Sequence, residues 1–227
     1  MYRIELHCHT NHTSKCGRLT AEETARGYRD AGYSGIVVTD HYNRDTVAYM
    51  NIDVNDPADV LKKFLLGYEM MKEAGEKYGL RVYRGAELRF DECVNDYILL
   101  NWKPELLGNM GGILPMSIVE FSRLARREAP ESFLYQAHPY REKCTPAIAC
   151  YLEGIEILNT SPRHDSRDAL AKEYAERHGL IGLAGSDCHR TEDIGRSGIL
   201  TETLPKDEEE LTALIRSGQF SVIEPEN

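Results

Sequence analysis

The sequence predicts an α/β protein with a mostly parallel sheet or barrel, built as a single domain over residues 1–227. Short apolar or β-branched stretches alternate with amphipathic helical stretches nearly throughout the chain, which is typical of repeated βα units. A length of 227 residues is usual for one such domain. The chain contains no internal repeat, linker or low-complexity segment that would divide it.

Seven stretches predict the main strands. They cover residues 3–10, 35–39, 80–86, 96–100, 133–137, 154–158 and 180–184. Further short strands are expected at residues 197–201 and 221–224.

Apolar residues at helical spacing predict the helices between these strands. The first begins at Thr20, forms a capping box with Glu23 and stops at Gly32. The others cover residues 59–78, 115–128, 146–152, 166–178 and 207–217. We interpret residues 43–57 as a loop over the site, and residues 102–114 as loop or short helix.

Composition restricts the function. The net charge is -10 and no basic tract is present, which argues against a dedicated nucleic-acid binder but not against a small phosphorylated substrate. No apolar run reaches the roughly 18 residues that a membrane span needs. Because the chain enters a strand at its start, we expect no signal peptide. The six cysteines contain no C-x-x-C pair and predict reduced thiols in a cytoplasmic protein.

Two histidines in the first strand suggest a metal site. His7 and His9 are two residues apart and alternate with apolar residues, so both imidazoles should share the face opposite the apolar one. Two neutral imidazoles held that close suit a divalent metal. For this motif alone, a strand with two partly exposed histidines is an equal alternative.

Five of the predicted strands end in residues that can bind metal. Besides His7 and His9, these residues are Asp40, His41, Glu87, His138, Asp187 and His189. Functional groups of parallel α/β proteins gather at the carboxyl ends of the strands. If the sheet closes into a barrel, all these side chains converge on one mouth.

The ligand types fit Zn, Mn or Fe, and the candidates exceed what one tetrahedral ion can bind. We therefore expect more than one ion, with a carboxylate such as Glu87 bridging two of them. The sequence contains no nucleophile elbow, no Ser-His-Asp spacing and no G-x-x-x-x-G-K phosphate loop. The expected nucleophile is a metal-bound hydroxide.

Five motifs together resemble the PHP (polymerase and histidinol phosphatase) family. They are His7-Cys8-His9-Thr10, Thr39-Asp40-His41, Gly85-Ala86-Glu87, Ala137-His138-Pro139 and Gly185-Ser186-Asp187-Cys188-His189, in family order. The resemblance implies a distorted (βα)7 barrel, phosphoester hydrolysis and a cluster of two to three divalent transition-metal ions.

The same resemblance implies a ligand set for each ion. The sets are His7, His9, Glu87 and Asp187 for one ion, Glu87 and His138 for a second, and His41 and His189 for a third. Asp40 would not bind an ion directly but would orient the residues that do. Asp40, His189 and Arg141 are the candidate catalytic residues.

The chain departs from the family pattern in two places. Many members have an Asp or His in the loop after the first strand, where this chain has His12, Lys15 and Cys16. Protonated Lys15 cannot bind metal, whereas Cys16 could as a thiolate and His12 could if the loop bends back. Members with the histidinol-phosphatase pattern also have a His between the third and fifth strands. The nearest polar residues here are Asn95, Asp96 and Asn101.

Three further residues are candidates for binding a substrate phosphate. Arg141 follows His138 closely and could bind a phosphate through two N–H groups. Arg163 and His164 come just after the sixth strand. Each of the three could instead be a solvated or salt-bridged loop residue.

The leading hypothesis is a metal-dependent phosphoesterase that hydrolyses a small phosphorylated metabolite through a metal-bound hydroxide at a multinuclear site. An amidohydrolase-like barrel is an alternative, but that class often uses a carboxylated Lys on a middle strand, and no Lys ends a strand here. A nuclease-type phosphodiesterase and a non-catalytic metal-binding module are further alternatives. The sequence indicates no membrane partner and no particular oligomeric state.

Overall fold

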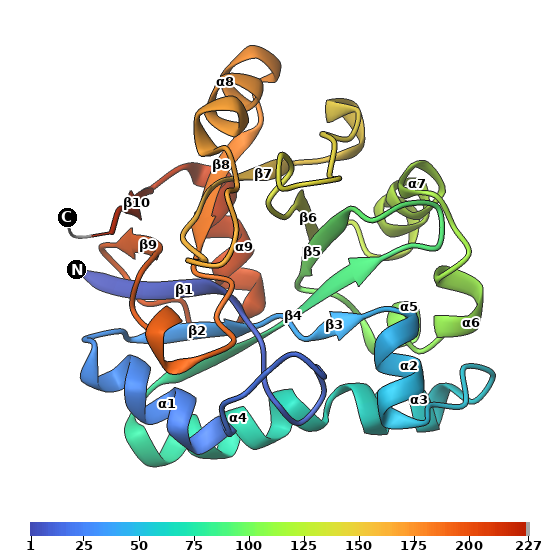
Figure 1. Cartoon of the computed structure of the whole chain (residues 1–227), viewed down its shortest axis with the longest axis horizontal. Helices are drawn as coiled ribbons and strands as arrows, with labels where there is room; N and C mark the ends of the chain where they lie inside the picture. The colour runs from blue at the N-terminus through green and yellow to red at the C-terminus, as the bar shows by residue number, and fades with distance from the viewer. Residues whose placement is uncertain (226–227) are drawn as a thin grey trace.

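A computed structural model describes residues 1–225 and shows a sheet that curls into a nearly closed barrel (Figure 1). The strands are β1 (Tyr2–Cys8), β2 (Gly35–Val38), β3 (His41–Tyr42), β4 (Arg81–Arg89), β5 (Asp96–Leu100), β6 (Phe133–Gln136), β7 (Gly154–Asn159), β8 (Ile181–Gly185), β9 (Gly198–Thr201) and β10 (Phe220–Ile223). Their order is β10-β9-β1-β2-β4-β5-β6-β7-β8, and the short β3 pairs with β4 beyond the end of β2. All the strands predicted from the sequence are present.

Strand direction explains why the barrel is distorted. β1, β2 and β4 are parallel neighbours, and so are β6, β7 and β8. β5 runs antiparallel to both β4 and β6, while β9 and β10 extend the sheet beyond β1 in antiparallel fashion. The predicted distorted βα barrel is therefore confirmed, and β5 is the reversed strand in it.

The barrel closes where the chain beyond β8 meets the end of β1. The His9 N–H donates to the Cys188 carbonyl at 2.9 Å, and the Cys188 N–H donates to the His7 carbonyl at 3.0 Å. These two hydrogen bonds place residues 7–9 beside residues 187–189, although the two segments lie at opposite ends of the sequence.

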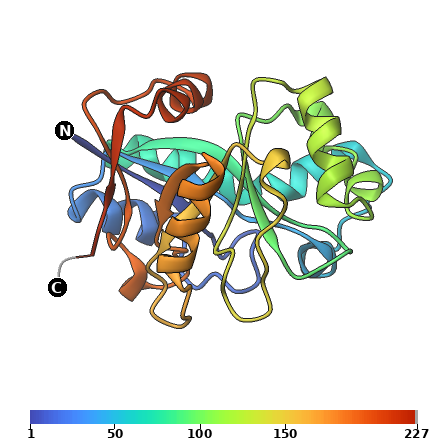
Figure 2. The same ribbon diagram turned by 90° about the horizontal axis from the view of Figure 1, so that it is seen from above.

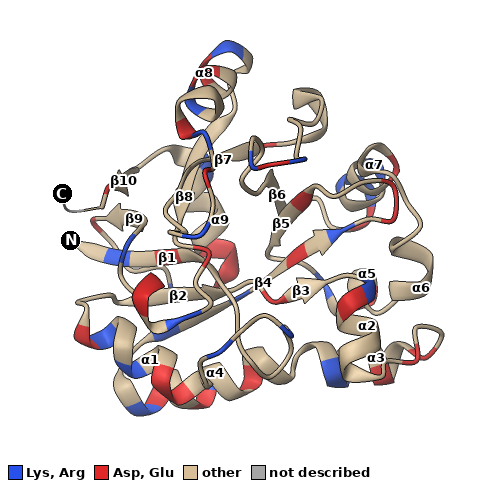
Figure 3. Ribbon diagram, viewed as in Figure 1, with Lys and Arg blue, Asp and Glu red and all other residues tan. Residues whose placement is uncertain are grey.

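The helices surround the barrel, as Figure 1 and the view from above in Figure 2 show. They are α1 (Ala21–Asp30), α2 (Arg44–Met50), α3 (Pro57–Phe64), α4 (Leu66–Tyr78), α5 (Pro104–Leu107), α6 (Met110–Ile113), α7 (Ile118–Glu128), α8 (Asp168–His178) and α9 (Glu208–Ser217). The Thr20–Glu23 capping box is present at the start of α1. Basic and acidic residues are interspersed along α1 and α4 (Figure 3).

Three local predictions are wrong. Residues 43–57 are not a continuous loop, because the Asn43 side chain accepts from the Thr46 N–H and starts α2. The helix predicted over 59–78 is divided at Leu65 into α3 and α4. Only Ala149–Tyr151 of the helix predicted over 146–152 is helical, as one 3₁₀ turn.

Apolar residues fill the barrel below the mouth. Ile4 and Leu6 of β1 pack there with residues from β2, β4, β5 and β6, and α9 covers that cluster with Leu211 and Ile215. Cys8 instead belongs to the cluster beneath α1 and α4. The prediction that Cys8 shares the apolar face of Ile4 and Leu6 is therefore wrong, and the register of β1 with β2 shifts between Glu5 and Cys8. His7 and His9 do lie side by side as predicted, with their Nε2 atoms 3.1 Å apart.

All six cysteines are free thiols. Among residues 1–225, no helix has both the length and the apolar character needed to cross a membrane.

Asp40 holds the loop after β1 in place through hydrogen bonds. Its carboxylate accepts from the Thr10 N–H at 2.8 Å and from the Ser14 hydroxyl at 2.6 Å. Gly67 of α4 lies directly behind, where its N–H donates to the Thr13 hydroxyl at 2.9 Å. A Cβ at Gly67 would collide with the Asp40 carboxylate and the Thr10 hydroxyl.

We expect Gly67→Ala to destabilise the protein by about 1–3 kcal/mol, because the added methyl overpacks this contact. An ordinary Gly→Ala change inside a helix has the opposite sign, about 0.5–1 kcal/mol of stabilisation. Urea unfolding measures the difference, with Glu73→Ala at an exposed position of α4 as the control. An unfolding midpoint for Gly67→Ala equal to or above that of the parent protein would contradict this prediction.

Candidate metal centre

Glu87 is at the centre of the histidines at the barrel mouth. It lies within β4 and pairs in register with His41 of β3. Its Oε1 lies 3.2 Å from the Nε2 atoms of both His7 and His138. Its Oε2 lies 2.6 Å from His41 Nδ1 and 3.4 Å from His9 Nε2. One buried carboxylate therefore contacts four imidazoles, which come from three places: the end of β1, β3 and the end of β6.

Asp187 is the second buried carboxylate of the cluster. Its Oδ1 lies 3.4 Å from His7 Nε2 and 3.3 Å from both His9 Nε2 and His189 Nδ1. Its Oδ2 accepts a hydrogen bond of 2.7 Å from Arg141. The structure thus brings together all seven residues that the sequence predicts as metal ligands, which are His7, His9, His41, Glu87, His138, Asp187 and His189.

Two of these residues have left-handed backbone, His138 with φ +28° and Asp187 with φ +51°. Non-glycine residues rarely adopt this conformation, and they keep it where the surrounding structure holds them. At His138 the holding group is Glu156, whose Oε2 accepts from the His138 N–H at 2.8 Å.

Glu156 of β7 orients His7 as well. Its Oε1 lies 3.0 Å from His7 Nδ1, so that His7 Nε2 faces the two central carboxylates. A carboxylate that fixes the outer nitrogen of a metal-binding histidine is a common supporting contact. Sequence reasoning missed Glu156, although a carboxylate inside an apolar strand was an available signal.

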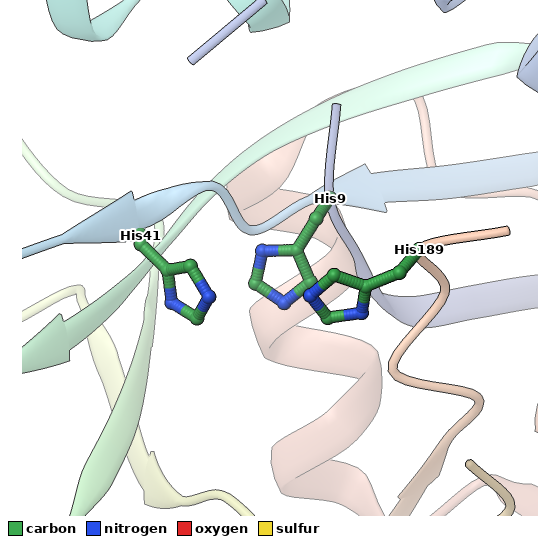
Figure 4. Close-up of side chains that lie close together, drawn as sticks. All are labelled: His9, His41 and His189. Atoms are coloured by element: carbon green, nitrogen blue, oxygen red, sulfur yellow. The ribbon is translucent and has the colours of Figure 1, made fainter. Parts of the chain in front are cut away.

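The imidazoles of His9, His41 and His189 lie close together (Figure 4). We call them the open side of the cluster, because His41 and His189 are partly exposed to solvent. His9, His41 and His189 offer ring nitrogens that all lie within 4.8 Å of one another. The ring centroid of His9 lies 4.3 Å from those of both His41 and His189. On the outer side, His189 Nε2 lies 3.1 Å from the Cys16 Sγ atom.

Asp96 is a further group at the mouth that the sequence does not predict as a metal ligand. It offers a carboxylate oxygen within 4.8 Å of ligand atoms of His41 and Glu87, and it is paired with Arg89 at 2.8 Å. Because β5 is antiparallel, its first residue lies where the parallel strands end. The short segment between β4 and β5 was the available signal, since a parallel connection needs a dozen or more residues.

Charge interactions shift the pKa values of the central groups. Burial alone would lower the pKa of His7, but Asp187, Glu156 and Glu87 raise it well above its ordinary value. Burial alone would raise the pKa of Glu87, but His41 and His7 lower it well below its ordinary value. The carboxylates therefore keep their negative charge and hold positive charge on nearby imidazoles.

On the open side of the cluster, the pKa values of His9 and Cys16 are lowered. Burial lowers the pKa of His9, and the neighbouring His189 and His41 lower it further. Burial alone would raise the pKa of Cys16, but hydrogen bonds to His189 and His41 lower it to about 6. His9 is thus a neutral ligand candidate, and Cys16 lies among groups that favour the thiolate.

The residues present fit divalent transition-metal ions. Among the described residues, the buried atoms Glu87 Oε2 and His41 Nδ1 have no hydrogen-bond partner, although they lie 2.6 Å apart. Their geometry does not suit a hydrogen bond, whereas a cation could bind both atoms. The donor set of imidazole nitrogen and carboxylate oxygen suits Zn, Mn or Fe.

A cavity of about 340 Å³ opens above the cluster. It is lined by ligand candidates and by five arginines, Arg18, Arg89, Arg141, Arg163 and Arg190. Arg141 is fixed by Asp187 and by Asn159 at 3.0 Å, while its buried Nε has no partner among the described residues. Arg163 forms two hydrogen bonds with Asp193, at 2.7 and 2.8 Å. The third predicted phosphate-binding residue, His164, also lines this cavity.

Other candidates lie away from the cavity. Asp40 is not among the residues that line it and instead holds Thr10 and Ser14. The idea that His12 bends back to the site is wrong, because its Nε2 accepts from the Ala21 N–H at 3.4 Å. Lys15 is exposed to solvent.

Sequence comparison supports the resemblance drawn from the motifs. Residues 167–220 match the PHP-associated family. No curated protein matches the sequence.

Comparison with solved structures supports the fold. A two-domain protein from Bacteroides vulgatus, containing a predicted PHP-like metal-dependent phosphoesterase, is 16% identical with a TM-score of 0.67. The match covers 99% of this chain but only 65% of that protein. A candidate metal-dependent phosphoesterase from Bifidobacterium adolescentis is 16% identical with a TM-score of 0.55, over 95% of this chain and 96% of the other. An amidohydrolase from Chromobacterium violaceum has the same identity and TM-score, over 99% of both chains.

We expect Glu156→Ala to weaken zinc binding roughly 10–100-fold, because His7 loses the group that orients it. Competition with a chromogenic chelator measures the affinity. Glu153→Ala is the matched control, since Glu153 lies next to the same strand but pairs with Arg216 on the surface. Equal affinities for the two variants would contradict the positioning role of Glu156.

Proposed function

We propose that this chain belongs to the PHP family and that it hydrolyses phosphate monoesters of small metabolites with the help of divalent transition-metal ions. The observation that carries the proposal is the combination of Glu87 and Asp187 among five imidazoles with an arginine-lined cavity directly above them. Neither part alone would distinguish a phosphoesterase from a simple metal-binding site.

The metal-holding roles in this proposal follow the clusters of ligand atoms. His7, His9, Glu87 and Asp187 would hold one ion, Glu87 and His138 a second, and His41 and His189 would help hold a third. Ions of this class activate water as a nucleophile and neutralise charge that develops on phosphoryl oxygens. Glu87 contacts members of all three sets, which favours it as the bridging ligand.

The substrate phosphate would bind next to Arg141. Its guanidinium is held by Asp187 and Asn159, and its Nε is a buried donor without a partner among the described residues. The Ser161 hydroxyl lines the same cavity and is likewise unpartnered in the described part of the chain. Two unsatisfied donors at one place favour an anion with several oxygen acceptors, such as a phosphate.

The cavity favours a small substrate. A volume of about 340 Å³ is at the lower end of the range for small-molecule sites. The net charge of -10 gives no general attraction for a nucleic acid, whereas the arginines attract an anion locally. No lysine lines this cavity, which disfavours the carboxylated Lys of the amidohydrolase alternative.

We expect the purified protein, loaded with Mn or Zn, to release p-nitrophenol from p-nitrophenyl phosphate. The His9→Ala, Asp187→Ala double variant should lose this activity, because it removes ligands from the cluster. Phosphate release after chelation and after metal addition provides the measurement. Parent activity no higher than that of the double variant would refute the phosphoesterase proposal.

Comparing the rates for a phosphate monoester and a phosphate diester distinguishes a monoesterase from a nuclease. We expect kcat/KM for p-nitrophenyl phosphate to exceed that for bis-p-nitrophenyl phosphate and for short oligonucleotides. Preference for the diester and the oligonucleotides would favour the nuclease alternative and overturn the monoester assignment.

We expect Arg141→Lys to lower kcat/KM for a monoester about 10–100-fold, since lysine keeps the charge but loses the planar pair of donors. Because Arg141 also contacts Asp187, metal content is measured in parallel and should be unchanged. Arg127→Lys, at an exposed position of α7 outside the cavity, is the control and should change the rate little. Unaltered kinetics of Arg141→Lys would remove Arg141 from the substrate site.

A further inference from the structure

Cys16 lies on the open side of the cluster, and the proposed function gives it no role. Its Sγ lies 3.1 Å from His189 Nε2, and it lines the same cavity as His41 and Glu87. The other five cysteines do not line this cavity.

The loop that carries Cys16 is fixed at several points. On one side Asp40 holds Thr10 and Ser14, as described above. On the other side the Arg18 N–H donates to the His189 carbonyl at 2.9 Å. Between them, the Gly17 N–H donates to the Ser14 carbonyl at 3.0 Å. The thiol is therefore held beside His189 by the backbone on both sides of it.

An independent observation points to a cation at this place. Glu87 Oε2, on a side chain only 1% exposed, has no hydrogen-bond partner among the described residues and faces His41 Nδ1. His9, His41 and His189 supply three more nitrogens within 4.8 Å of one another. These donors converge on one region, and Cys16 lies at its solvent side.

We propose that Cys16 is a thiolate ligand of the ion held by His41 and His189. The Sγ–H proton is released to solvent as the sulfur–metal bond forms, and no electron is transferred. A thiolate with imidazoles is a soft donor set that favours Zn or Co, whereas carboxylate-rich sets suit Mn or Mg. This position of the cluster therefore selects a softer ion than the positions around Asp187. The inference rests on the metal-binding part of the proposed function and not on catalysis.

Cobalt substitution tests the proposal without any activity measurement. Protein loaded with Co(II) should show the intense near-ultraviolet charge-transfer band of thiolate-bound cobalt. Cys16→Ser should lose the band and keep the weaker visible bands of cobalt bound to the remaining ligands. Cys93→Ser, at another exposed cysteine, should leave the spectrum unchanged.

Thiol reactivity gives a second measurement. With Zn bound, one fewer cysteine should react quickly with a disulfide reagent than in metal-free protein, and Cys16→Ser should abolish that difference. We also expect Cys16→Ser to weaken binding of the last Zn ion roughly 10–100-fold and to leave Mn binding nearly unchanged. Persistence of the charge-transfer band in Cys16→Ser, or its absence from the parent protein, would overturn the proposal. Loss of phosphoesterase activity with an intact band would instead count only against the proposed reaction.

Discussion

The burial of two carboxylates at the barrel mouth constrains the rest of the site. Glu87 is 1% exposed and Asp187 is 3% exposed, and a buried carboxylate is costly unless positive charge or hydrogen bonds compensate it. That compensation comes from imidazoles of β1, of β3 and of the segments after β6 and β8, and from the Arg141 guanidinium. A bound metal ion would supply the positive charge that protons on the imidazoles otherwise provide. The two buried carboxylates are therefore compensated by groups of the protein itself, and the same cluster is suited to binding cations.

Closure of the barrel determines whether this compensation exists. His7 and His9 come from the first strand, and Asp187 and His189 come from the segment after β8. Hydrogen bonds between the two backbones hold them together. Buried Glu5 strengthens the same junction, because it accepts from the Ser186 N–H and hydroxyl and from the Tyr28 hydroxyl. A change that opened the junction would separate the ligands even if each side chain kept its own conformation.

The sequence predicts which side chains meet at the mouth, because a simple rule of topology applies to them. Residues at the ends of parallel strands meet at one mouth, so His138 and Asp187 could be expected together without any knowledge of their distance. The rule fails for Asp96, which begins the reversed strand β5. It also gives no information on Glu156, whose role depends on contacts across the barrel to His7 and His138. The helix α2 was missed because Asn43, interpreted as a loop residue, is in fact its N-terminal cap.

Five arginines place positive charge at the barrel mouth of a chain whose net charge is -10. Arg141, Arg163 and Arg89 are each held by an aspartate, namely Asp187, Asp193 and Asp96. Those carboxylates fix the guanidinium groups before a ligand arrives, which reduces the conformational entropy lost on binding. Asp187 also contacts the histidines of the metal cluster. Because Asp187 contacts both the histidine cluster and Arg141, a metal ion bound by the histidines and a phosphate bound by Arg141 would be positioned by the same carboxylate.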